Sequence, residues 1–218
     1  MDFDVETTCR TISAFGGANP IVPLGMVSAL LLGLTGHGGG ARRWGAAIVA
    51  MSALIFVWKV IFHGWNYGIA ALDFGAPSGH AALASAVLPV LCGWLSAGQR
   101  PGLNRAGFAA GWVLATMVAI SRIPIGAHSP AEAIAGWLLG SSVSLVALRS
   151  LDRPLVPPRA AITVICLVAA LLAPAANRVL PREELPKKVA RHLNGSGRIY
   201  ERADLHAALP VRVPAPRG

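Results

Sequence analysis

Residues 75–97, GAPSGHAALASAVLPVLCGWLSA, place Ser78 and His80 directly before a long apolar run. Serine is a preferred N-cap residue, so we expect a helix to begin after Ser78. The run over 79–97 approaches the ~20 apolar residues that cross the hydrocarbon core of a bilayer, and it lacks the strict alternation of a barrel strand. The stretch therefore predicts a capped membrane-spanning helix with a titratable ring at its start.

The rest of the chain extends this pattern. Of the 218 residues, 54% are hydrophobic and 13% are charged, which is unusual for a soluble protein. We predict an all-α fold, a polytopic membrane helix bundle of about six transmembrane helices. The predicted domains are an N-terminal extramembrane segment over 1–19, the membrane domain over 20–176 and a basic C-terminal tail over 177–218. The expected spans are 20–35, 44–62, 79–97, 106–125, 130–148 and 160–176.

The net charge of +9 is distributed as in a membrane protein. Most of the Lys and Arg residues lie either in short loops on one side of the predicted bundle or in the tail, which indicates orientation signals and no nucleic-acid partner. The positive-inside rule makes the arginine-rich loops cytoplasmic and turns the opposite side, which we call the motif side, outward. Six crossings also put the basic tail on the motif side. Either the tail is translocated, which we favour, or the sixth run does not cross.

Ionisable residues gather at the motif side, where spans two and four end and spans three and five begin. Each has a structural alternative: Lys59 a snorkelling side chain, His63 a member of an aromatic belt, and Glu132 part of a Ser-Pro-Ala-Glu capping box. For Ser78 the structural alternative is the N-cap of the helix that follows it. Charged residues near a span are nevertheless costly and indicate function. The cluster comprises Lys59, His63, His80, Arg122, His128 and Glu132.

Together these residues predict a phosphate site. Arg122 offers a planar fork and Lys59 a point charge. The backbone N–H groups of Ser78, Gly79 and His80 lie at a helix N-terminus, where anions bind. Glycine at position 79 would let the backbone approach the anion closely.

Two histidines beside a phosphoryl group suggest covalent catalysis, with one neutral ring attacking phosphorus and one charged ring protonating the leaving oxygen. Glu132 follows His128 by one helical turn and would fix its tautomer. The matching position after His80 is Ala84, which has no charge. The asymmetry predicts His128 as the nucleophile and His80 as the acid.

These residues resemble the type 2 phosphatidic acid phosphatases, a family that includes glucose-6-phosphatase and vanadium haloperoxidases. Its second motif, Pro-Ser-Gly-His, matches residues 77–80, and its third matches Ser121-Arg122, His128 and, with Glu in place of the usual Asp, position 132. The resemblance implies a phosphohistidine mechanism that needs no metal and no cofactor, with Ser121 and Arg122 at the phosphate. The first motif departs, because Lys59 is followed by Asn66-Tyr67 where the family has Arg-Pro. His63 would replace part of the missing charge when protonated.

We therefore expect a phosphatase in a bacterial inner membrane, with a site facing the periplasm and membrane lipids as partners. The substrate is a lipid phosphate or lipid diphosphate. The alternatives are a lipid phosphotransferase and a non-catalytic phospholipid-binding protein. Gly136 and Gly140 form a GxxxG pair that lets a helix approach closely, either inside the bundle or across a homodimer. The tail is either solvated or an amphipathic helix on lipid headgroups.

Overall fold

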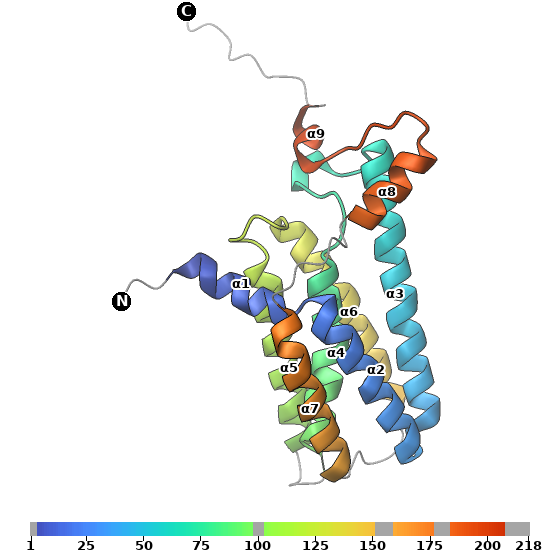
Figure 1. Cartoon of the computed structure of the whole chain (residues 1–218), viewed down its shortest axis with the longest axis vertical. Helices are drawn as coiled ribbons and strands as arrows, with labels where there is room; N and C mark the ends of the chain where they lie inside the picture. Colours follow the sequence, from blue (N-terminus) through green and yellow to red (C-terminus); the bar gives the residue numbers. More distant parts are fainter. Residues whose placement is uncertain (1–3, 98–102, 151–158, 177–183, 208–218) are drawn as a thin grey trace, which may run out of the picture. The chain divides into compact units, whose positions relative to one another are not determined.

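A computed structural model describes residues 4–97, 103–150, 159–176 and 184–207, and it is all-α as predicted (Figure 1). Every predicted span coincides with a helix. A kinked stretch, Gly33–His37, in which Thr35 and Gly36 have non-helical backbone angles, joins the second and third helices, and a short 3-10 turn, Ala70–Leu72, follows the third. The helices are α1 Val5–Phe15, α2 Ala18–Leu32, α3 Gly38–Trp65, α4 Gly79–Leu95, α5 Leu103–Ser121, α6 Pro130–Ser150, α7 Arg159–Ala176, α8 Glu184–Leu193 and α9 Arg202–Ala207.

The polarity of the helices is that of a membrane bundle. Among the described residues, two helical stretches, Val5–Trp65 and Pro130–Arg149, are long and apolar enough to cross a membrane. Many large apolar side chains, such as Met26, Val49 and Val113, are exposed, whereas Ser28, Ser85 and Ser144 are fully buried. Small polar residues inside and apolar residues outside are typical of helices packed in lipid. The number of crossings stays a prediction.

The chain forms two compact units. The first comprises Met1–Ile55 and Pro77–Leu180, and the second comprises Phe56–Ala76 and Pro181–Gly218. The first unit holds α1, α2, most of α3 and the helices from α4 to α7. The second holds the end of α3, the loop that follows it, and the two C-terminal helices. The predicted division at residues 19 and 176 stays a prediction.

Helix α4 is the centre of the first unit and packs against both α5 and α6. Gly136 and Gly140 of α6 face the α4 backbone so closely that an added Cβ would collide with carbonyl oxygens of Ser78 and Ala82. The GxxxG pair is therefore used inside the chain. The homodimer stays a prediction without support from this pair.

A second glycine pair, which the sequence analysis did not single out, brings α5 against the other side of α4. A Cβ on Gly107 would lie 2.5 Å from the Cys92 carbonyl oxygen, and one on Gly111 would lie 2.5 Å from that of Leu88. The buried indole of Trp44 on α3 donates to the Ala86 carbonyl at 3.0 Å. Three neighbours therefore fix the position of α4, whose first residues carry the Pro-Ser-Gly-His motif.

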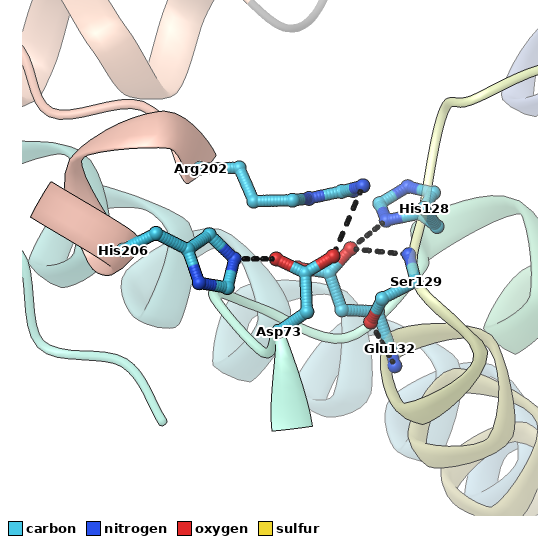
Figure 2. A network of polar contacts seen from close by, with 6 residues as sticks. All are labelled: Asp73, His128, Ser129, Glu132, Arg202 and His206. Atoms are coloured by element: carbon cyan, nitrogen blue, oxygen red, sulfur yellow. Dashed lines mark hydrogen bonds and ion pairs between the residues drawn. The ribbon is translucent and has the colours of Figure 1, made fainter. Parts of the chain in front are cut away.

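In the second unit the tail folds back onto the end of α3. The Nδ1–H of His63 donates to the Tyr200 carbonyl at 2.8 Å, and the Tyr200 N–H donates to the His63 carbonyl at 2.9 Å. Leu205 of α9 is buried against Gly68. Figure 2 shows Asp73 paired with Arg202 and His206 of α9. The C-terminal helices therefore pack against the end of α3 and the loop that follows it, within the second unit.

Candidate active site

The first turn of α6 contains the predicted capping box. The Glu132 N–H donates to Ser129 Oγ at 3.2 Å, and the Ser129 N–H donates to Glu132 Oε2 at 3.2 Å. Pro130 occupies the first helical position, where its missing N–H costs nothing. The local sequence thus fixes the Glu132 carboxylate just before the helix, with Oε2 turned back toward the preceding loop (Figure 2).

His128 lies at the end of that loop and contacts the same oxygen. Its Nδ1–H donates to Glu132 Oε2 at 2.8 Å, and the exposed fractions of the two residues are 8% and 4%. A carboxylate at Nδ1 selects the tautomer that leaves a lone pair on Nε2, and it stabilises positive charge on the ring. The contact through which Glu132 would orient His128 is thus present, while the role of His128 as nucleophile stays a prediction.

The loop between α5 and α6 ties Arg122 to His128. The Arg122 carbonyl accepts the N–H groups of both Ala127 and His128 at 3.2 Å. Gly126 has a φ of 68°, a conformation that favours glycine, and it lets the chain turn back. This closed loop explains why five residues separate Arg122 from His128 in the sequence.

The Arg122 guanidinium is buried and contacts the N-terminal helix. Its Nη1 donates to Ser13 Oγ at 2.5 Å, and Ser13 is 4% exposed. Sequence reasoning missed Ser13, since a lone serine in a short amphipathic helix carries no motif. Ser121, predicted as a phosphate ligand, donates its own hydroxyl to the Val118 carbonyl at 2.7 Å, which favours a structural role.

The start of α4 adjoins the first turn of α6. Ser78 caps α4 as predicted, accepting the Ala81 N–H at 3.5 Å. Its own N–H donates to the Glu132 carbonyl at 2.9 Å, so the predicted anion cradle is reduced to the N–H groups of Gly79 and His80. A Cβ on Gly79 would meet no atom of the described residues within 4 Å. His80 is partly buried on the first turn of α4.

Lys59 and His63 belong to the second unit. Both are partly buried on the last turns of α3, and the His63 ring is hydrogen-bonded to the tail. Asn66, where the family motif has arginine, adopts a φ of 57° and donates to the Asp204 carbonyl at 3.3 Å. Its neighbour Tyr67 is largely exposed. The departure from the motif is therefore used for a turn and for a contact with the tail.

The mechanism implied by the family resemblance needs no metal ion. Within the described part of the chain, no three or more His, Cys, Asp and Glu side chains group in a way that could hold a metal ion. The polar groups described above are hydrogen-bond donors, acceptors and charges suited to an anion.

Comparison with known proteins agrees with this geometry. The model of the PAP2 superfamily matches residues 61–154, and an uncharacterized 22.5 kDa protein in the cps region of Klebsiella pneumoniae is 33% identical over 202 residues, covering 90% of this chain and 97% of that protein. The chain belongs to the PAP2 superfamily. The matched region contains the second and third motifs and begins just after Lys59. No solved structure matches the chain. Membership of the PAP2 superfamily supports a phosphatase-type activity on a phosphoric ester.

Proposed function

We propose that this PAP2 protein is an integral membrane phosphatase that releases phosphate from a lipid phosphate or lipid diphosphate through a phosphohistidine intermediate. The observation that carries the proposal is the buried contact between His128 Nδ1 and Glu132 Oε2 at 2.8 Å. A helix cap requires Glu132, but it does not require the buried His128 imidazole that binds the same carboxylate oxygen. A nucleophilic histidine needs both.

The reaction proceeds in two displacements. His128 Nε2 attacks phosphorus while the ester P–O bond breaks, and His80 gives its proton to the departing oxygen. Water then attacks the phosphohistidine, the P–N bond breaks, and His80 takes a proton from that water. Inorganic phosphate leaves and both rings return to their starting states. Arg122 and the N–H groups of Gly79 and His80 bind the phosphoryl oxygens.

The surroundings of the motifs support a lipid substrate. Ile123 follows Arg122 directly and is 36% exposed, and Ile134 on α6 is 58% exposed. Apolar side chains that remain uncovered next to a phosphate site suit a headgroup whose acyl or prenyl chains lie along the bundle. We place the site at the outer face of a bacterial inner membrane, since the arginine-rich helix ends lie opposite the motif side.

The test uses purified full-length protein in detergent with a chelator present. Phosphate release is measured on phosphatidic acid, phosphatidylglycerol phosphate, undecaprenyl diphosphate and a lipid A phosphate. Wild type should release phosphate from at least one substrate, and His128→Ala should release none. Equal release by both proteins would remove His128 as nucleophile. Phosphate that appears on an added acceptor lipid, with none free, would identify a phosphotransferase.

Glu132→Gln tests the orienting carboxylate. The amide keeps the size of the side chain but loses the charge, so kcat should fall by roughly 10²- to 10⁴-fold. Glu184→Gln is the matched control, because Glu184 is also an acid in the first turn of a helix but is exposed on α8. It should keep the wild-type kcat. An unchanged kcat in Glu132→Gln would contradict the mechanism.

A further inference from the structure

The N-terminal helix brings a hydroxyl group to the phosphate site that none of the motifs contains. Ser13 lies in the last turn of α1 and is 4% exposed. Its Oγ accepts a hydrogen bond from Arg122 Nη1 at 2.5 Å. A hydrogen bond to a charged donor is strong when both groups are buried, and it restricts the rotamers of a long side chain.

The position of Ser13 is set by the packing of its neighbours in the chain against α4 and α5. Its neighbour Ile12 packs against the buried side chains of Ala84, Ala115 and Val118. On the other side, Gly16 approaches α5 so closely that an added Cβ would collide with the Val118 side chain. Residues on both sides of Ser13 therefore hold α1 against α4 and α5, and the hydroxyl has little freedom to move away from Arg122.

The same segment also borders the proposed acid. Gly17, which caps the start of α2, is buried, and a Cβ added there would lie 3.5 Å from His80 Nε2. The short stretch from Ser13 to Gly17 thus contacts Arg122 of the third motif and lies beside His80 of the second. Its position next to two separate motifs indicates that this stretch is part of the site wall.

We propose that Ser13 is a positioning residue for the phosphate site, because it holds the Arg122 guanidinium ready for an anion. The inference rests on the proposed role of Arg122 as a phosphate ligand. Arginine has several rotatable bonds, and binding costs less free energy when they are already fixed. Ser13 uses one N–H of the guanidinium fork and acts on the substrate only through Arg122.

The first test measures binding of inorganic phosphate to the full chain in detergent by calorimetry. Ser13→Ala removes the acceptor, and Ser13→Cys keeps the side-chain volume with only a weak acceptor. Both should raise the Kd for phosphate by roughly three- to tenfold. Ser13→Thr, which keeps the hydroxyl, should restore affinity. Thr11→Ala is the matched control, because the exposed Thr11 hydroxyl bonds only the Thr7 carbonyl among the contacts described.

The second test compares steady-state constants on the best lipid phosphate. The Ser13→Ala and Ser13→Cys variants should raise KM while kcat changes less, whereas a general loss of packing would lower the melting temperature and the active fraction instead. Folded Ser13→Ala and Ser13→Cys proteins with wild-type Kd and KM would overturn the inference. If Ser13→Ala does not fold, the Kd and KM of Ser13→Cys alone still test the inference.

The two proposals fail in different ways. Hydrolysis by wild type, with unchanged phosphate binding in the Ser13 variants, removes the positioning role and leaves the phosphatase. Phosphate binding that weakens in the Ser13 variants, without hydrolysis of any ester, keeps the positioning role and removes the phosphatase. A wild-type protein that binds no phosphate and hydrolyses no ester overturns both.

Discussion

Glu132 combines two tasks in one oxygen atom. Oε2 accepts the Ser129 N–H, which belongs to the helix cap, and the His128 Nδ1–H, which belongs to the proposed chemistry. Each donor alone would hold the carboxylate loosely, whereas together they fix it. The preference of helix N-termini for negative charge adds to both. Truncation to alanine would therefore damage fold and catalysis together, which is why the isosteric amide is the informative substitution.

Gly79 is a residue whose identity the protein's own packing does not explain. An added Cβ meets no described atom within 4 Å, so Gly79→Ala should keep the fold and stabilise α4 by up to ~1 kcal/mol. If a phosphate approaches the Gly79 and His80 N–H groups, the methyl group should nevertheless lower kcat/KM by roughly 10- to 100-fold. Thermal unfolding measures the predicted change in stability, and phosphate release measures the predicted change in kcat/KM.

Gly39→Ala provides the control for this substitution. Gly39 is an exposed glycine in the first turn of α3, and an added Cβ there also meets nothing within 4 Å. It should match Gly79→Ala in stability and wild type in activity. Wild-type activity in Gly79→Ala would show that the anion does not approach the start of α4.

Asn66 shows why arginine cannot simply be returned to the first motif. A backbone φ of 57° costs most residues roughly 1–2 kcal/mol of conformational free energy, and asparagine is among the exceptions. Asn66→Arg also removes the bond to the Asp204 carbonyl. We therefore expect faster hydrogen exchange in α8 and α9 and no gain in kcat/KM. Tyr67→Arg, at the exposed neighbouring position, should leave exchange unchanged. A large gain in activity from Asn66→Arg would mean that the turn is dispensable.

At the scale of the helices, the close approaches around α4 depend on absent side chains. A Cβ at Gly140 would collide with the Ala82 carbonyl, which is backbone and cannot rotate away. Gly140→Ala should therefore destabilise the protein by about 1–3 kcal/mol or more, seen as a lower melting temperature in detergent. Gly45→Ala on α3, where a Cβ meets nothing within 4 Å, should not. Equal melting temperatures would place α6 farther from α4.

The helices and the catalytic motifs were predictable because their signals are local. Apolar runs predicted the bounds of the helices to within a few residues except at the start of α3, and Ser78 and the Ser129–Glu132 box marked helix starts correctly. The contact of Ser13 with Arg122 joins residues 109 positions apart, and no periodic pattern in the sequence indicates it. The spacing of Gly107 and Gly111 was visible in the sequence, but its partner helix was not. Two residues of the arginine-rich loops on which the predicted orientation depends, Arg100 and Arg153, lie outside the described residues.

The folded tail was also hidden from sequence reasoning, because its contacts are polar and distant along the chain. Lys187 pairs with Glu201 at 2.8 Å and holds the pKa of that carboxyl below its usual range. Arg198 lies 4.7 Å above the Tyr200 ring. Exposed pairs of this kind contribute little individually. Together with the bonds to His63 and the buried side chains of Ala190 and Leu205, they hold α8 and α9 against the end of α3 and the loop that follows it.

For the whole molecule, the tail bears on the conflict between its charge and the positive-inside rule. Helix α3 has 28 residues and is about 42 Å long, more than the ~30 Å hydrocarbon core. Its two ends therefore lie on opposite sides if it spans the membrane. Arg42 and Arg43 mark one end, and the contacts between His63 and Tyr200 bind the tail to the other. This arrangement favours a translocated tail over a sixth helix that does not cross.

Cysteine labelling tests this topology directly. In a background with the three native cysteines replaced by alanine, Tyr67→Cys and Ser196→Cys introduce exposed thiols at the end of α3 and in the tail, and Arg43→Cys introduces one at the start of α3. A membrane-impermeant maleimide should label positions 67 and 196 in intact spheroplasts, and position 43 only after lysis. Labelling of 196 together with 43 would separate the tail from the end of α3. Labelling of 43 alone in intact spheroplasts would turn the motif side to the cytoplasm, and the phosphatase would then act on lipids of the inner leaflet.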